Sequence, residues 1–166
     1  KVLYLLHGHS DDHSAYIRKS LIEVLVRRYD LAVVMPDAHR SGYANMIHGH
    51  RYYDYMTEDV MMQAPNFFPI STKPEDTYIA GLSMGGAGAM KIGLNNPGRF
   101  AGVGCMSAGA TSAGTGRGMF TSADFESNSR RIAEGSPGAG LIALLRDLDS
   151  RGGMPGTKFY HSCGTE

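Results

Sequence analysis

Short apolar runs alternate with longer stretches of mixed polarity along the chain. The apolar runs are short enough to be buried strands, and the longer stretches repeat their apolar residues at helical spacing. We expect strands at residues 2–6, 31–35, 77–80, 100–106 and 157–161. We expect helices at residues 14–29, 52–63, 84–95 and 138–150. This alternation predicts an α/β fold, with a mostly parallel sheet and helices on both of its faces.

The first expected helix, at residues 14–29, has a clear amphipathic pattern. Ile17, Leu21, Val24 and Leu25 recur at helical spacing. We expect one continuous helix whose apolar face lies on the sheet.

A glycine-flanked serine lies between an expected strand and an expected helix. The residues are Gly81-Leu82-Ser83-Met84-Gly85, directly after the strand at 77–80. A chain that turns from strand into helix within so few residues leaves no room for side chains beside the serine, which explains both glycines. The pattern predicts a nucleophile elbow with Ser83 as the nucleophile. The alternative is a glycine-rich loop that only lets a helix pack tightly on a sheet.

A second motif follows the first strand. The apolar run at residues 2–6 ends in His-Gly-His at residues 7–9. When a serine attacks an ester, negative charge develops on the carbonyl oxygen, and backbone N–H groups fixed beforehand can stabilise it. We expect the N–H groups of His9 and Met84 to form this oxyanion hole, the second at a helix N-terminus that also favours an anion. This role uses only the backbone of His9.

Together these motifs resemble the serine esterase family that includes esterase D, tributyrin esterases, S-formylglutathione hydrolases, feruloyl esterases and mycolyltransferases. The matching segments are Leu5–His13, Val34–Asp37, Tyr78–Gly86 and Tyr160–Glu166. The resemblance implies an α/β-hydrolase fold, no cofactor, and cleavage of short acyl esters through an acyl-serine intermediate. It also implies Ser83 as nucleophile, with His9 and Met84 as the oxyanion donors.

The chain ends depart from the family pattern. The chain opens inside one expected strand and stops just after another, so we expect it to be truncated at both ends. In α/β-hydrolases the catalytic order is serine, acid, histidine, and the acid lies in the loop after the strand expected at 157–161. The acid therefore falls at Glu166 or just beyond it, and the histidine that acts as general base falls further downstream.

Seven histidines are present in the sequence. His161 lies inside the last expected strand, upstream of the expected acid. His39, His48 and His50 lie in the loop after the second strand, near the edge where the site should open. These positions are more typical of a pocket rim than of the general base.

A metal-dependent alternative uses His7, His9, Asp11 and His13. Imidazole and carboxylate groups at such spacing can bind zinc and generate a hydroxide nucleophile. The register differs by one residue from that of metallo-β-lactamase-type hydrolases, because Asp12 stands where a histidine is needed. A structural role for these histidines is favoured, and no metal is expected.

Two other functions stay open. A thioesterase of the S-formylglutathione hydrolase type would use the same serine. A non-catalytic relative that only binds a ligand is disfavoured, because both the nucleophile and the oxyanion loop are intact.

Two longer loops, at residues 38–51 and 107–137, are expected to set substrate preference. The stretch from Tyr43 to Phe68 is dense in Met and aromatic residues. Most of these should be core, and a few are candidates for an adaptable apolar wall around an acyl chain.

Composition narrows the partners. The chain has 166 residues, of which 42% are hydrophobic, which predicts one domain spanning residues 1–166. The formal net charge is zero and the charges are interspersed, so the sequence predicts no nucleic-acid partner. No apolar run approaches the roughly 20 residues that span a bilayer. The expected partner is a small acyl ester, and homo-oligomerisation stays open.

Overall fold

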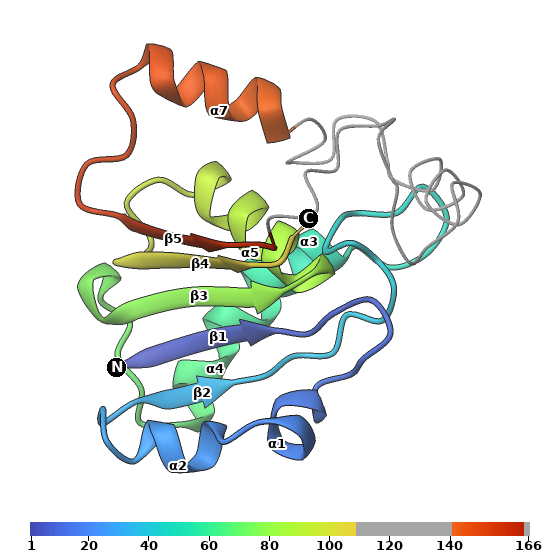
Figure 1. The fold of residues 1–166 in the computed structure, drawn as a ribbon, viewed down its shortest axis with the longest axis vertical. Coiled ribbons are helices and arrows are strands. Elements are labelled where there is room, and N and C mark those ends of the chain that lie inside the picture. The colour runs from blue at the N-terminus through green and yellow to red at the C-terminus, as the bar shows by residue number, and fades with distance from the viewer. Residues whose placement is uncertain (109–140, 165–166) are drawn as a thin grey trace.

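Five parallel strands form the centre of the molecule. The structure is a computed structural model that describes residues 1–108 and 141–164. The strands are β1 (Val2–Leu6), β2 (Ala32–Val34), β3 (Thr77–Leu82), β4 (Gly102–Met106) and β5 (Lys158–Ser162). They lie in the order β2-β1-β3-β4-β5, and every neighbouring pair is parallel (Figure 1). All strands therefore present their carboxyl ends at one edge of the sheet.

Helices connect the strands. They are α1 (Ala15–Lys19), α2 (Ile22–Val26), α3 (Tyr52–Asp54), a π-helical segment η1 (Tyr55–Val60), α4 (Met61–Phe67), α5 (Met84–Asn95) and α7 (Leu141–Ser150), with a 3₁₀ turn η2 at Pro74–Asp76. The expected α/β fold class is confirmed, and the observed helix α5 has the expected bounds. The helix expected at 52–63 continues without a break to Phe67.

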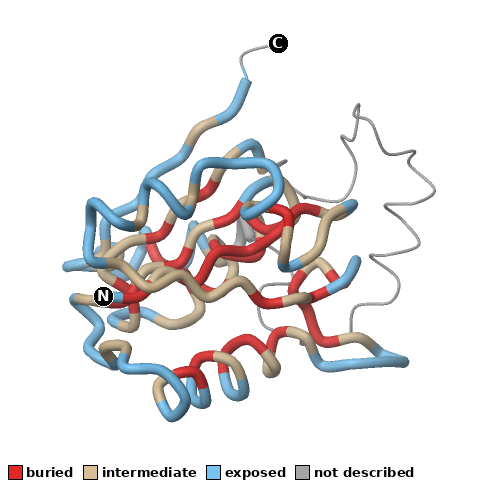
Figure 2. The backbone as a smooth tube through the Cα atoms, turned by 90° about the horizontal axis from the view of Figure 1, so that it is seen from below, coloured by how far each residue is buried: buried red, intermediate tan, exposed pale blue. Residues whose placement is uncertain are grey.

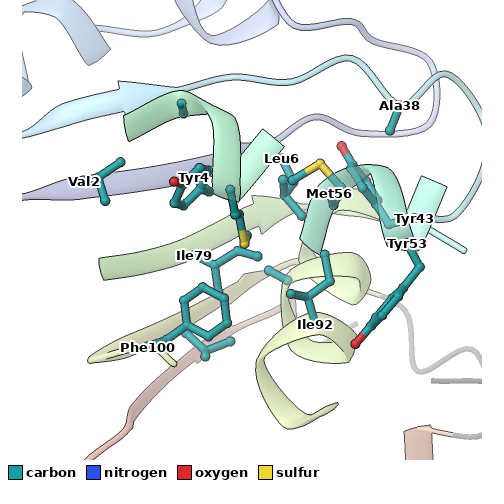
Figure 3. Close-up of a cluster of buried hydrophobic side chains, with 14 residues drawn as sticks. Val2, Tyr4, Leu6, Ala38, Tyr43, Tyr53, Met56, Ile79, Ile92 and Phe100 are labelled. Atoms are coloured by element: carbon teal, nitrogen blue, oxygen red, sulfur yellow. The ribbon is translucent and has the colours of Figure 1, made fainter. Parts of the chain in front are cut away.

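The hydrophobic core lies on one face of the sheet. Alternate residues of β1, namely Val2, Tyr4 and Leu6, point to this face with Ile79 of β3 and Val103 of β4. Side chains of α5 and of the helical segments from α3 to α4 complete the cluster (Figure 3). Figure 2 shows the same distribution along the backbone, with buried segments in the middle of the molecule and exposed segments at its periphery. The burial of these side chains holds this face of the parallel sheet against the helices that cover it.

The opposite face of the sheet contains an apolar hollow of about 440 Å³. The residues that line it are Lys1, Leu3, Tyr29, Leu31, Tyr78, Ile79, Ala80, Gly102, Val103, Gly104, Lys158, Phe159 and Tyr160. Tyr160 is 62% exposed. The described residues therefore fill one face of the sheet more completely than the other.

The prediction of one continuous helix at residues 14–29 is wrong. Ser20 ends α1, because its hydroxyl donates to the Tyr16 carbonyl at 2.6 Å and its backbone becomes extended. The Ile22 N–H then bonds the Ser20 hydroxyl at 3.2 Å at the start of α2. The residues of the expected apolar stripe are exposed rather than packed on the sheet: Ile17, Leu21, Val24 and Leu25. The side chain of a single serine competes with the helical hydrogen bonds and divides the stripe.

Parts of the sequence predictions fall outside the described residues. These are residues 138–140 of the last expected helix, most of the loop at 107–137, and Glu166. No helix within the described ranges is long and apolar enough to cross a membrane.

Candidate active site

Ser83 lies in the tight connection between β3 and α5. Its backbone has φ 56° and ψ −117°, a conformation that a residue with a side chain rarely adopts. The Ser83 N–H donates to the Met106 carbonyl at 2.8 Å, and the Ala87 N–H donates to the Ser83 carbonyl at 3.0 Å. These bonds join the serine to β4 and to the first turn of α5, so the strained backbone is held from both sides.

The glycines around Ser83 are required by close backbone contacts. A Cβ atom added to Gly81 would lie 2.3 Å from the backbone of Gly85, and one added to Gly85 would lie 2.1 Å from the Leu6 carbonyl oxygen. Both distances are far below any real van der Waals contact. Helix α5 thus begins directly against the ends of β1 and β3, which supports the reading of this segment as a nucleophile elbow.

The loop after β1 lies beside the serine. Leu6 and Gly81 are register partners in adjacent parallel strands, so both chains leave the sheet at the same edge. A Cβ atom added to Gly8 would be 3.7 Å from the Cβ of Ser83. His9 is half-buried in this loop, and Met84 is the first residue of α5. The structure therefore brings the three residues expected from the sequence to one place.

His7 is buried and engages the backbone through both ring nitrogens. Its Nδ1 donates to the Gly8 carbonyl at 2.8 Å, and its Nε2 accepts the Ala38 N–H at 3.0 Å. A nitrogen that accepts this bond has no proton, so the geometry assigns the neutral ring with hydrogen on Nδ1. The Asp37 carboxylate is 3.5 Å from Nε2. Because Nε2 accepts the N–H of the adjacent residue Ala38, we interpret the closeness of Asp37 as a result of that bond and not as an ion pair.

Asp37 lies among three histidines at the edge of the site. It is 3.3 Å from His13 Nδ1 and 3.7 Å from His39 Nδ1, in addition to the contact with His7. Partial burial alone would raise the pKa of Asp37. Hydrogen bonds from the His39 N–H and from the His13 side chain outweigh that effect and hold the pKa of Asp37 below its ordinary value. The side chains of His13 and His39 therefore both interact with the Asp37 carboxylate.

The zinc-binding arrangement is not assembled. His7 turns inward to the backbone, His13 pairs with Asp37, and Asp11 pairs with Lys19. Within residues 1–108 and 141–164, no group of three or more His, Cys, Asp or Glu side chains is arranged to hold a metal ion. His161 lies on β5, opposite Cys105 of β4.

The loop at residues 38–51 makes contacts that sequence reasoning missed. Tyr43 is fully buried, its hydroxyl donates to the His7 carbonyl at 3.1 Å, and burial raises its pKa. The Lys91 ammonium of α5 donates to the Gly42 carbonyl at 2.8 Å. The only signal in the sequence was the density of aromatic residues after residue 43, which does not distinguish Tyr43 from its neighbours.

Aromatic side chains near the start of α3 form a half-exposed group. Tyr52 makes edge contacts with His39, His50 and Tyr55, at ring-centroid distances of 6.1, 5.8 and 6.3 Å. These rings lie on the side of the site bounded by Asp37, whose charge contributes to raising the pKa of Tyr52 and Tyr55, although burial is the larger cause. The rim role expected for His39 and His50 stays a prediction.

The sequence matches a known protein family. Residues 1–136 match the family model Esterase, described as "Putative esterase". An acetyl esterase from Caldicellulosiruptor saccharolyticus is 35% identical over 104 residues, which are 62% of this chain and 39% of that protein.

Two solved structures from Staphylococcus aureus are similar over nearly the whole chain. The fluorophosphonate-binding serine hydrolase FphF, in a substrate-bound structure, has 33% sequence identity and a TM-score of 0.80, covering 99% of this chain and 64% of its own. The S-formylglutathione hydrolase FrmB has 32% identity and a TM-score of 0.79, covering 100% of this chain and 65% of its own. The chain therefore spans less than two thirds of the length of these relatives.

Proposed function

We propose, given that this chain belongs to the esterase family, that the full-length protein is a serine carboxylesterase that hydrolyses short-chain acyl esters. One observation supports this most directly: Ser83 is held in a strained backbone conformation beside the loop after β1. A strained serine at the carboxyl edge of a parallel sheet is the arrangement that serine hydrolases of this fold use.

We assign the chemical roles as follows. The Ser83 hydroxyl attacks the ester carbonyl, and the N–H groups of His9 and Met84 stabilise the negative charge on the tetrahedral intermediate. The alcohol leaves, and water then releases the acid from the acyl-serine. A histidine must take and return the proton. Since His7 bonds the backbone and His13 pairs with Asp37, we assign the base to neither of them.

The proposed substrate is small and carries little charge. The chain has no net charge, which gives no basis for nucleic-acid binding, and the similar protein from C. saccharolyticus is an acetyl esterase. We therefore propose acetyl esters and other short acyl esters as the first substrates to test.

The test is the reaction of the full-length protein with a fluorophosphonate and with p-nitrophenyl acetate. A covalent adduct at Ser83, seen by intact mass and peptide mapping, together with loss of hydrolysis in Ser83→Ala, is the expected result. The variant should keep the thermal stability of the wild type. Undiminished hydrolysis in Ser83→Ala would refute the assignment of the nucleophile, and unchanged activity after chelator treatment is the control against a metal-dependent route.

A thioester substrate is the second candidate. It is favoured by the similarity to FrmB, an S-formylglutathione hydrolase with 32% identity to this chain. Comparison of kcat/KM for S-formylglutathione and for p-nitrophenyl acetate distinguishes the two. The candidate with the larger value is the better description, and Ser83→Ala should abolish both reactions.

A further inference from the structure

The segment after β2 donates hydrogen bonds to His7, the first residue after β1. The Tyr43 hydroxyl donates to the His7 carbonyl at 3.1 Å. The Ala38 N–H donates to the His7 ring at 3.0 Å. All three residues are buried. Because the peptide of His7 leads through Gly8 to His9, these bonds fix the backbone on which the proposed oxyanion donor lies.

The same segment is also attached to the helix that follows Ser83. The Tyr43 ring packs against Gly88 of α5 so closely that a Cβ atom there would lie 2.5 Å from the ring. One turn further along α5, Lys91 donates to the Gly42 carbonyl at 2.8 Å. Tyr43 thus contacts both elements that provide the proposed oxyanion donors, the loop of His9 and the helix that begins at Met84.

The backbone of Tyr43 is itself strained. It has φ 53°, which is unfavourable for a bulky side chain, and its N–H bonds the Ser41 hydroxyl at 3.0 Å. Such a conformation persists only where surrounding contacts determine it, and strained residues of this kind cluster at functional sites. The contacts with His7 and with α5 provide that determination.

We infer that Tyr43 and His7 are positioning residues for the oxyanion hole. Tyr43 spans the gap between the loop of His9 and helix α5, and so sets the separation of the two backbone N–H donors. This role rests on the proposed function. Both side chains are buried, so we assign neither of them a contact with the substrate. Oxyanion stabilisation depends on donors that are fixed before the reaction, so a small displacement lowers the rate without weakening substrate binding.

The chain offers a matched control for this inference. Tyr53 is also buried in the core, but its hydroxyl accepts a hydrogen bond from Asn96 at 2.9 Å and does not contact His7. Figure 3 shows the two hydroxyl groups pointing to opposite sides of the cluster. Tyr43→Phe and Tyr53→Phe therefore remove the same atom from the same core, and only the first removes a bond to the oxyanion loop.

The experiment measures kcat and KM for p-nitrophenyl acetate in the full-length protein, and the inhibition constant of a trifluoromethyl ketone, whose adduct places an oxyanion in the hole. For Tyr43→Phe we expect kcat to fall about tenfold with KM within about twofold, and the ketone to bind about tenfold more weakly. For Tyr53→Phe we expect all three values within about twofold of the wild type.

A second pair of variants tests the other bond. In His7→Gln the side-chain oxygen can accept the Ala38 N–H, whereas the shorter side chain of His7→Asn cannot reach it. His7→Gln should therefore retain at least about threefold more kcat than His7→Asn. If Tyr43→Phe does not fold, this pair of variants still tests whether the contacts of His7 position the oxyanion hole.

Each outcome separates this inference from the function on which it rests. Equal kcat in Tyr43→Phe and wild type, an equal loss in Tyr43→Phe and Tyr53→Phe, or an equal loss in His7→Gln and His7→Asn would overturn it while leaving the esterase assignment intact. A wild type that neither hydrolyses esters nor reacts at Ser83 would overturn the proposed function and this inference with it.

Discussion

Gly85 shows how a single residue determines the geometry around Ser83. Because an added Cβ would lie 2.1 Å from the Leu6 carbonyl oxygen, Gly85→Ala must displace backbone that is part of the sheet. We expect a loss of about 3 kcal/mol in the free energy of unfolding, and no fluorophosphonate adduct at Ser83. Urea unfolding and intact mass measure the two effects.

The control is Gly98→Ala. Gly98 has φ 78°, but no atom lies within 4 Å of an added Cβ. Only backbone strain opposes that substitution, so it should cost about 1 kcal/mol and leave labelling intact. A loss in Gly85→Ala no greater than that in Gly98→Ala would contradict the close contact.

Lys91 gives the stability a dependence on pH. Burial lowers the pKa of Lys91 to about 8, from 10.5. Between these values the unfolded chain keeps a proton that the folded chain has released, so the free energy of unfolding rises with pH. We expect this rise between pH 8 and pH 10 in the wild type and a smaller one in Lys91→Met, measured by urea unfolding at pH 7.5 and 9.5.

Tyrosines with raised pKa values limit this rise in the free energy of unfolding at its upper end. Burial raises the pKa of Tyr16 to about 12, so above pH 10 the folded chain binds more protons than the unfolded chain and stability falls. Replacement of the exposed Lys73 by Met is the control for removing a lysine. An identical pH response in the wild type and Lys91→Met would place the titration on another group.

Local and distant contacts differ in how far the sequence predicts them. The glycines around Ser83 follow from a strand–turn–helix pattern that is complete within a few residues, and the structure gives both of them close contacts. The bond from Tyr43 to His7 joins positions 36 residues apart, and no periodicity marks either partner. His7 was expected only as part of a motif, and its ring contacts became visible only when the chain was folded.

Among the helical elements, α3 begins with a cap that comes from outside the helix. Arg51, the N-cap residue of α3, makes no side-chain hydrogen bond that caps the helix. Instead the buried Asn45 accepts the N–H groups of Tyr53 and Asp54 at 3.1 and 3.2 Å, and donates to the Asp54 carboxylate at 2.9 Å. We expect Asn45→Ala to lower the free energy of unfolding by about 2 kcal/mol, measured by urea unfolding.

Asn66→Ala is the control for this cap. Asn66 is exposed on α4, where its side-chain amide donates to the Gln63 side chain at 3.1 Å. Its replacement should change the stability by less than about 0.5 kcal/mol. Similar losses in both variants would show that the Asn45 side chain does not act as the cap.

The elements also show where patterns mislead. Helix α5 has the bounds expected from its sequence, because the elbow fixes its start. The segment at 14–29 has an equally clear pattern, yet it breaks at Ser20. Periodicity reports which side chains can share a face, but it does not report whether a serine hydroxyl will replace a helical hydrogen bond.

At the scale of the whole molecule, the two faces of the sheet differ. Parallel sheets generally have both faces covered. Among the described residues, the core fills one face, while the other keeps the hollow of about 440 Å³, which is lined in part by the exposed side chains of Phe159 and Tyr160. FphF, which this chain matches over 64% of the length of FphF, shares the fold. The sequence predicted the strands of this sheet, but strand patterns alone do not specify what covers each face.

A polypeptide of residues 1–166 expressed alone should therefore present accessible apolar surface. We expect it to enhance the fluorescence of the dye ANS and to self-associate with increasing concentration, because exposed apolar patches of this kind promote association. Tyr160→Glu places a charge in the hollow and should weaken both effects. Dye titration and sedimentation velocity at several concentrations measure them.

The matched control for the hollow is Phe67→Glu. Phe67 is 76% exposed on α4, against 62% for Tyr160, but it does not line the hollow. If the hollow is the surface responsible, the more exposed residue must have the smaller effect. A stronger reduction in dye binding for Phe67→Glu than for Tyr160→Glu would contradict this prediction. It would show that the dye binds the surface around Phe67 on α4, and that the exposed fraction of a side chain, not its place in the hollow, determines dye binding.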